Sequence, residues 1–426
     1  MSQQASSDRS RARRPAHGWG HALLTVLAGL VVMVATAALG LWAAGAADLP
    51  GSGFPRVVAA VVVMAAGGSV ELSGNAGDLA RTHAEFSVLP LSVTLAGALV
   101  IAAGFLRPLR HRAVAGAREL AGWAARVAVL WALVLIGLSV LARASFDISV
   151  RNATDAAIAD LLGVSPKVGF RADVPLTLVL GLLWLVGILV LALLVSRSAP
   201  LPGRLLRFQE SVRPAAYAMV ALLLGCVVVG LVVALVVLGV RGHPADTFAV
   251  ILLGLPNLVW LAYTLGLGAS WEGKVEGPFG LPMPQMLDSV LRTPDISTVN
   301  VSTLAEHDGR AWWLVVAAAV LTVAAACLMA VRSPARIRPW QHAVHMAVAL
   351  VLTVLTICLV ARVSAHYGVS LLGIGDLGGG LGGELTLRPR LWSALAVAAL
   401  WGLVTGFLGG LLASRVDRRG EVPTRG

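Results

Sequence analysis

Charged residues are scarce in this chain, and their scarcity excludes most protein classes. Only 13% of the 426 residues are Asp, Glu, Lys or Arg, whereas 58% are hydrophobic and the mean hydropathy is +0.84. A soluble globular domain carries about 25% charged residues. Uncharged apolar runs of about 20 residues, long enough for the hydrocarbon core of a bilayer, recur along the whole chain. These runs are continuous rather than alternating, which excludes a transmembrane β-barrel and predicts an all-α polytopic membrane protein.

Lysine is almost absent. The 33 basic residues include only two lysines, Lys167 and Lys274. Together with the excess of Ala, Gly, Val and Leu, this bias is typical of a GC-rich bacterial genome and predicts a bacterial plasma membrane. The arginines lie in short clusters between apolar runs, a pattern typical of orientation signals for membrane insertion. A nucleic-acid site would need a basic face interleaved with aromatic residues, so the net charge of +11 does not indicate one.

Cysteines and catalytic motifs are also few. The three cysteines, Cys226, Cys327 and Cys358, fall inside apolar runs without the spacing of metal ligands, which predicts a packing role. Neither H-E-x-x-H nor G-x-S-x-G occurs, and the glycine-rich run 373–384 lacks the Lys-Ser/Thr of a phosphate loop. No carboxylate falls in the middle of a clear span. We therefore expect no catalytic residue, metal or cofactor, and an intramembrane enzyme is the least favoured alternative.

Ten apolar segments divide the chain. Two are ambiguous: 57–70 is short, and 247–271 is interrupted by a proline within "LLGLPNLVWLAYTLGLG" (252–268). The other eight are predicted to span the membrane at about 22–43, 86–106, 120–142, 174–196, 215–240, 311–331, 343–361 and 391–414.

The distribution of arginine decides between the possible topologies. If both ambiguous segments enter and leave the membrane on one side, 20 of the 33 basic residues lie in short cytoplasmic segments, with both termini cytoplasmic. If both span instead, the division becomes 17 to 16, and "RPLRHR" (107–112) lies outside. Because cytoplasmic loops carry the excess of Lys and Arg, the first topology is favoured. It places the acidic segment 272–310, with a net charge of −3, outside the cytoplasm.

This topology makes each ambiguous segment a re-entrant hairpin. In the second, Pro256 and Asn257 would form the tip, because proline removes a backbone donor and disfavours helix at the preceding residue. Backbone groups freed at membrane depth need partners in protein or water, so the tip would line a polar pathway. The alternative is an ordinary spanning helix with a proline kink.

Similar pentapeptides indicate two tandem parallel repeats. "LARAS" (141–145) recurs as "VARVS" (360–364), and "LLVSR" (193–197) recurs at nearly the same offset as "LLASR" (411–415). The predicted organisation follows from this shared offset. It comprises a disordered basic cytoplasmic N-terminus (1–20), a first membrane repeat (21–200), a cytoplasmic linker (201–214), a second membrane repeat (215–415) with the extracytoplasmic loop 272–310, and a cytoplasmic tail (416–426).

Each ambiguous segment is followed by a carboxylate in a similar context. Glu71 follows "GGSV" and Glu272 follows "GASW", so Ser69 and Ser270 also occupy matching places. Carboxylates at the exits of re-entrant segments could bind a cation or transfer protons. The alternative is that they mark where the chain returns to water. The candidate polar pathway or partner contact therefore comprises Ser69, Glu71, Pro256, Asn257, Ser270 and Glu272.

Three longer stretches resemble a known family. "GGSVELSGNAGDL" (67–79), "SVLPLSVTLAGALV" (87–100) and "LLGLPNLVWLAYTLGLGASWEGKVEGPFGLPMPQML" (252–287) resemble the streptophobe family, hydrophobic membrane proteins of Streptomyces and related actinobacteria. The likeness covers nearly all of the chain except its polar ends and implies no catalytic residues. Residues 254–280 and 89–99 are similar, more loosely, to PerM-type cell-division membrane proteins of actinobacteria, although the loop 272–310 is longer than expected there.

Together these features predict a non-enzymatic multi-pass protein of the plasma membrane. The resemblance implies that it acts through membrane or envelope protein partners in envelope biogenesis or cell division. The alternative is a channel or transporter for an ion or small solute, since transporters often combine internal repeats with broken helices. That alternative requires Glu71, Asn257 and Glu272 to line one cavity.

Overall fold

The computed structural model describes ten stretches of the chain, and everything below refers to these stretches. They are residues 18–49, 53–76, 80–109, 117–147, 167–196, 203–241, 244–275, 297–334, 337–371 and 383–413. The predicted cytoplasmic tail 416–426, nearly all of the predicted N-terminal segment 1–20 and the middle of the acidic loop lie outside the described residues.

Nine of the described helices are long and apolar enough to cross a bilayer. Leu, Val and Ala at most positions provide the hydropathy, and many of the large apolar side chains point outward, as lipid contact requires. The chain is therefore a multi-pass membrane protein. The nine helices are α1 (Trp19–Ala43), α3 (Leu91–Leu106), α4 (Ala117–Leu141), α6 (Val174–Val195), α7 (Gly203–Arg241), α8 (Pro244–Leu267), α11 (Trp313–Arg332), α12 (Pro339–Val360) and α13 (Leu391–Ala413).

Each of the eight predicted spans coincides with one of these helices, and the ninth, α8, contains the stretch with the proline. The predicted linker 201–214 is not a separate segment, because α7 begins at Gly203 and continues through Pro214. The remaining helical elements are short: η1 (Ala46–Asp48), α2 (Gly53–Ala65), η2 (Arg107–Leu109), α10 (Val301–His307) and η3 (Gly309–Trp312).

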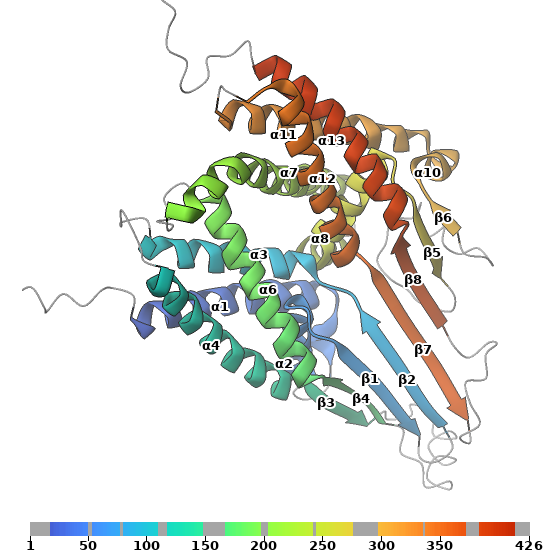
Figure 1. Ribbon diagram of the computed structural model, residues 1–426. Coiled ribbons are helices and arrows are strands. Elements are labelled where there is room, and N and C mark those ends of the chain that lie inside the picture. The colour runs from blue at the N-terminus through green and yellow to red at the C-terminus, as the bar shows by residue number, and fades with distance from the viewer. Residues whose placement is uncertain are drawn as a thin grey trace, which may run out of the picture.

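An antiparallel sheet of eight strands covers one end of the helical bundle (Figure 1). It was not predicted from the sequence. The strands lie in the order β3-β4-β1-β2-β7-β8-β5-β6. Their bounds are β1 (Val70–Ala76), β2 (Ala80–Ser87), β3 (Arg143–Asp147), β4 (Lys167–Ala172), β5 (Trp271–Val275), β6 (Ser297–Val299), β7 (Val363–Leu371) and β8 (Gly383–Pro389).

The two halves of the sheet have the same strand order, with β5 to β8 in the places of β1 to β4. The registers also correspond: Ala144 pairs with Phe170 in the first half, and Val363 with Leu387 in the second. Each residue of the first pair is separated from its counterpart in the second by nearly the same offset that relates the recurring pentapeptides.

The short helix α2 and the long helix α8 end in the same way. Gly67 follows α2 with φ +94°, and Gly268 follows α8 with φ +100°, a conformation that glycine adopts at least cost. The amide of Gly67 donates to the Met64 carbonyl, and the amide of Gly268 donates to the Leu265 carbonyl. The two caps are as far apart in the chain as the carboxylates that follow them.

The bundle has two distinct ends. At the sheet end, every pair of strands connects one helix to the next. At the opposite end, α3, α6 and α11 finish and α4, α7 and α12 begin, and arginines such as Arg107, Arg118 and Arg338 gather there. We call this second end the basic end. α1 begins and α13 finishes at the basic end (Figure 1).

Helix α8 lies across the sheet end of the bundle. Leu253 contacts α1 at Gly40, close to the end of that helix, and Gly266 meets the backbone of Leu314, in the first turn of α11. Both neighbours lie at the sheet end, although Leu253 lies in the first half of α8 and Gly266 in its last turn. α7 begins at the basic end, and α8 leads into β5 at the sheet end. Over the length of these two helices the chain therefore runs once from the basic end to the sheet end.

The prediction of two re-entrant hairpins is wrong in form. Segment 57–70 contains a single helix, α2, followed by its glycine cap and strand β1. Segment 247–271 contains one continuous helix that passes through Pro256. The hairpin interpretation assumed that the backbone would break at the proline. The helix continues because neighbouring residues supply hydrogen-bond partners there, as described below.

Close glycine contacts hold α12 and α13 together. A Cβ atom added at Gly402 would overlap the Cα atom of Ala347, and one at Gly406 would lie 2.7 Å from the His342 carbonyl oxygen. Small residues at such positions let two membrane helices approach until their backbones touch. The second half of the bundle therefore depends on the absence of side chains along one face of α13.

The substitution Gly402→Ala is expected to lower the free energy of unfolding by about 1–3 kcal/mol, because its methyl group would overlap the backbone of α12. Gly187 of α6 is the matched control, since nothing lies within 4 Å of a Cβ atom placed there. Gly187→Ala should leave stability unchanged or raise it by up to about 1 kcal/mol. Titration with denaturing detergent measures both variants, and equal stabilities would contradict this packing model.

Candidate functional site

The clearest constellation of predicted site residues lies where α8 meets the beginning of α3. The Ser92 hydroxyl of α3 donates to the Ile251 carbonyl at 2.8 Å and accepts from the Leu255 amide at 3.2 Å. A regular α-helix would join residues 251 and 255 directly. The serine thus bridges the backbone of α8 in the turn next to Pro256, where insertion of a side chain commonly accompanies a kink.

Asn257 completes the contact from the other side. Its side-chain oxygen accepts from the Leu91 amide at 3.2 Å, and its side-chain nitrogen donates to the Leu89 carbonyl at 2.8 Å. Leu91 is the first residue of α3, where amides have no partner within their own helix. We call these contacts of Leu89–Ser92 with Ile251–Asn257 the α3–α8 clasp. It uses the amide of Asn257 as a structural connector.

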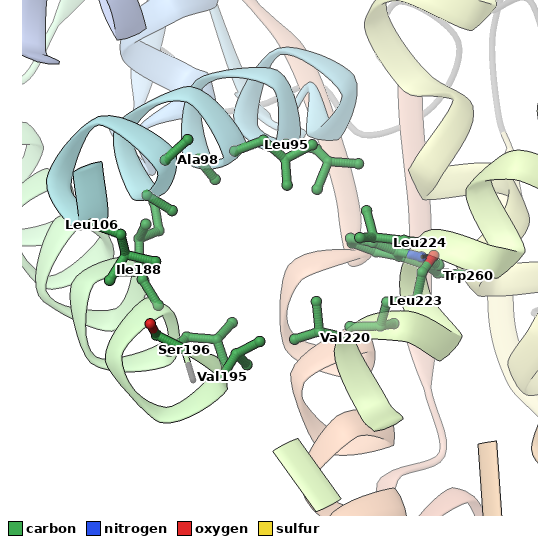
Figure 2. A pocket seen from close by; sticks show the side chains of 15 residues that line it. Leu95, Ala98, Leu106, Ile188, Val195, Ser196, Val220, Leu223, Leu224 and Trp260 are labelled. Atoms are coloured by element: carbon green, nitrogen blue, oxygen red, sulfur yellow. Dashed lines mark hydrogen bonds between the residues drawn. The ribbon is translucent and has the colours of Figure 1, made fainter. Parts of the chain in front are cut away.

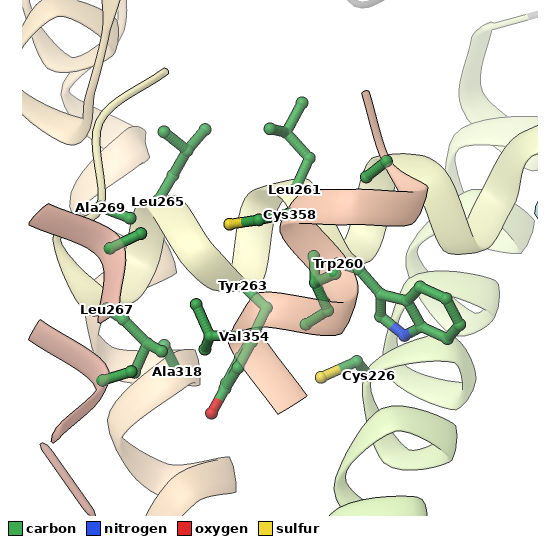
Figure 3. Close-up of a cluster of buried hydrophobic side chains, with 14 of the residues drawn as sticks. Cys226, Trp260, Leu261, Tyr263, Leu265, Leu267, Ala269, Ala318, Val354 and Cys358 are labelled. Carbon is green, nitrogen blue, oxygen red and sulfur yellow. The ribbon is translucent and has the colours of Figure 1, made fainter. Parts of the chain in front are cut away.

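The C-terminal half of α8 is buried in the hydrophobic core formed mainly by the second half of the chain. The Trp260 indole donates to the Leu223 carbonyl of α7 at 3.1 Å, and the Tyr263 hydroxyl lies 2.9 Å from the Thr322 hydroxyl of α11. Cys226 and Cys358 pack in the same cluster (Figure 3). These cysteines have the packing role expected from the sequence. α8 consequently joins the helices of both halves.

Glu71 and Ser69 lie at the start of β1, outside the helices. Glu71 is exposed, and its strand neighbours in the register are Arg171 of β4 and Glu85 of β2. The carbonyl of Ser69 accepts from the Asp173 amide at 3.4 Å. The Ser69–Asp173 hydrogen bond holds the residue before β1 against the N-cap residue of α6.

Glu272 and Ser270 occupy the corresponding place in the second half. The carbonyl of Ser270 accepts from the Arg390 amide at 3.0 Å, and Glu272 pairs with the Arg390 guanidinium at 2.6 Å. Both side chains of this ion pair are about half exposed, so water screens it and its contribution to stability is small. The pair connects β5 to the start of α13.

The six candidate residues do not form a single cavity. Four strand steps, about 19 Å at the usual strand spacing, separate β1 from β5 in the sheet, so Glu71 and Glu272 are not neighbours. Pro256 and Asn257 contact α3 instead of either carboxylate. The sequence analysis thus grouped residues that the fold keeps separate.

Sequence reasoning did not identify Ser92 as a partner of the proline-bearing segment. A signal for it was present, because "LPLS" (89–92) places a second proline and a hydroxyl directly before an apolar helix. The contact itself joins Ser92 to a turn of α8 that is distant in the chain, and no local pattern encodes such a contact.

The described residues provide no group of three His, Cys, Asp or Glu side chains that could hold a metal ion. Comparisons with known proteins add no assignment: no family model, curated protein or solved structure matches the chain. The geometry of the clasp and of the sheet is therefore the basis for a functional proposal.

Replacing Asn257 with leucine should lower the free energy of unfolding by about 1–3 kcal/mol, because the Leu91 amide and the Leu89 carbonyl lose their partners. The matched control is Thr356→Val, since the exposed Thr356 hydroxyl bonds only the Leu352 carbonyl of its own helix. The control should change stability by less than about 0.5 kcal/mol. Detergent-induced unfolding distinguishes the two, and an unchanged Asn257→Leu protein would show that the clasp does not stabilise the fold.

Proposed function

We propose that this chain is a plasma-membrane scaffold that presents its eight-stranded sheet, outside the cytoplasm, to a protein partner. The observation that carries the proposal is the sheet itself. The strands that connect the helices of both halves pair into one continuous sheet. Exposed charged side chains such as Glu71 and Arg388 lie on its strands. A rigid platform with such groups, held by a helical bundle, suits recognition of another protein.

The orientation in this proposal rests on charge. Arg107, Arg118, Arg332 and Arg338 lie at the basic end, and the positive-inside rule favours the cytoplasm for that end. The described parts of the acidic segment 272–310, which include β5, β6 and α10, belong to the sheet end. Both termini are then cytoplasmic, and the sheet faces the cell envelope.

Eight crossings are part of the same proposal. α7 begins at the basic end, α8 leads into the sheet, and α8 meets α1, α3 and α11 at the sheet end. We infer that α7 crosses the membrane and α8 lies in the outer half of the bilayer. The two matched halves each begin with a long helix and end with the helix that follows their last pair of strands, α6 or α13, and they are then parallel repeats.

A role in envelope biogenesis or cell division is supported by the resemblance to streptophobe and PerM-type proteins of actinobacteria. That resemblance includes "SVLPLSVTLAGALV" and "LLGLPNLVW", the two segments that form the α3–α8 clasp. A non-enzymatic role agrees with the use of Asn257 as a connector between helices.

A channel or transporter is the second candidate, because a cleft lies between helices of the two halves. The lining of this cleft is apolar apart from Ser196 and the Trp260 indole nitrogen, which suits an apolar ligand better than an ion. The three residues that the channel hypothesis placed together lie in separate environments. The scaffold is therefore the function that the geometry supports better.

Cysteine labelling in intact cells tests the orientation. Glu71→Cys and Glu272→Cys should react with a membrane-impermeant maleimide from outside, because both positions lie at the sheet end. Arg338→Cys is the matched control at the basic end, and it should react only after the cells are permeabilised. The reverse pattern would place the sheet in the cytoplasm and overturn the proposed orientation.

Photo-crosslinking tests the scaffold itself. A photoreactive amino acid at Glu71 or Arg388 should form an adduct of discrete mass with an envelope or division protein in living cells. Leu183 of α6 is the control, since it is 66% exposed on a face that lipid would cover. Sheet positions that give no protein adduct, or the same adducts as Leu183, would contradict the proposal.

A further inference from the structure

An apolar cleft of about 580 Å³ separates α3 and α6 of the first half from α7 and α8 of the second (Figure 2). Its volume is in the range of small-molecule binding sites. α3 contributes Ala98, Ala102 and Leu106, α6 contributes Ile188 and Val195, and α7 contributes Val220 and Leu224, while the Trp260 indole lies at one side.

The cleft exists because small side chains face it. Ala98, Ala102 and Ala103 line it from α3, and Ala192 lines it from α6, and their short side chains leave the space between α3, α6 and α7 unfilled. α8 joins the two halves at the sheet end through the clasp and the Trp260 contact. The cleft extends from Trp260 toward the ends of α3 and α6 at the basic end.

Water would be poorly held in most of this cleft, because its walls offer few polar partners. An empty cleft would also forfeit the dispersion contacts of its lining. The lining helices have the length and composition of membrane spans, so lipid tails are the apolar material next to them. An acyl chain is linear and apolar and could lie along the space between the helices.

Charge at one end of the cleft indicates which lipid fits. Leu106 and Ser196 line the basic end of the cleft, and the exposed Arg107 directly follows Leu106. The adjoining segments 107–112 and 197–213 together contain seven arginines. Guanidinium groups bind phosphate strongly, and basic residues near the bilayer surface favour anionic lipids.

We propose that the cleft is a binding site for an anionic phospholipid of the leaflet at the basic end. One acyl chain lies between α3, α6 and α7 as far as Trp260, and the phosphate lies near Arg107. The bound lipid fills the space between the two halves beneath α8. This site is independent of any partner that the sheet binds.

Native mass spectrometry of protein released from bilayers tests the proposal. The bilayers contain equal amounts of phosphatidylglycerol and phosphatidylcholine with identical acyl chains. The wild-type protein should retain one lipid and prefer phosphatidylglycerol by about five-fold or more, as expected for one favourable arginine contact. Equal retention of the two lipids overturns the proposal.

Two pairs of variants assign the retained lipid to the cleft. Ala98→Trp should abolish retention by filling the cleft, whereas Leu183→Trp, on an exposed face of α6, should retain the lipid. Arg107→Gln should reduce the preference for phosphatidylglycerol, whereas Arg118→Gln, at the start of α4, should preserve it.

Thermal unfolding of each variant first establishes that it folds, and Ala102→Trp replaces Ala98→Trp if the latter does not. Retention that is unchanged in a folded cleft-filling variant, or lost equally in Leu183→Trp, overturns the assignment to the cleft. A preference that Arg107→Gln and Arg118→Gln reduce equally contradicts the predicted position of the phosphate.

Discussion

The contact between the first turn of α3 and the proline-bearing turn of α8 is the constraint on which the rest of the structure depends. Ser92 and Asn257 satisfy backbone groups in both helices, so neither helix could be moved without leaving polar atoms unpaired in an apolar environment. In the same first turn of α3, the Thr94 hydroxyl donates to the Ala65 carbonyl at the end of α2 at 2.8 Å. The start of α3 therefore holds α2 and α8 at the sheet end together.

This contact also explains how the two halves act as one body. The N-terminal half of α8 packs on α1 and α3, while Trp260 and Tyr263 fix its C-terminal half among α7 and α11. At the surface, the pairing of β2 with β7 continues the same connection through the sheet. The halves thus meet through α8 at the sheet end, and the cleft between α3, α6 and α7 is the apolar space where lipid is expected.

The sequence was sufficient to predict the helices because each span is a long apolar run with arginines at its ends. Charge placement also set 57–70 and 247–271 apart as segments where crossings are disfavoured, which stays a prediction. The sequence was not sufficient to predict how Pro256 is accommodated, because its partner Ser92 belongs to a distant part of the chain. Proline indicated a break, and tertiary hydrogen bonds preserved the helix.

The sheet was missed for a different physical reason. Strands such as β1 and β2 are polar and short, so "ELSGNAGDLARTHAE" (71–85) resembles a loop, and their stability comes from pairing with segments far away in sequence. Matching positions such as Glu71 and Glu272 were recognisable, but their separation by four strand steps was not. The candidate site was therefore predicted residue by residue and not as an arrangement in space.

The position of the junction between α7 and α8 tests the central claim most directly. If α7 crosses the membrane and α8 lies in its outer half, Ala245, an exposed residue in the first turn of α8, lies on the same side as the sheet. An Ala245→Cys protein should then react with a membrane-impermeant maleimide in intact cells. Reaction only after permeabilisation would mean that α8 crosses the membrane and α7 does not, and would contradict this structure of the bundle.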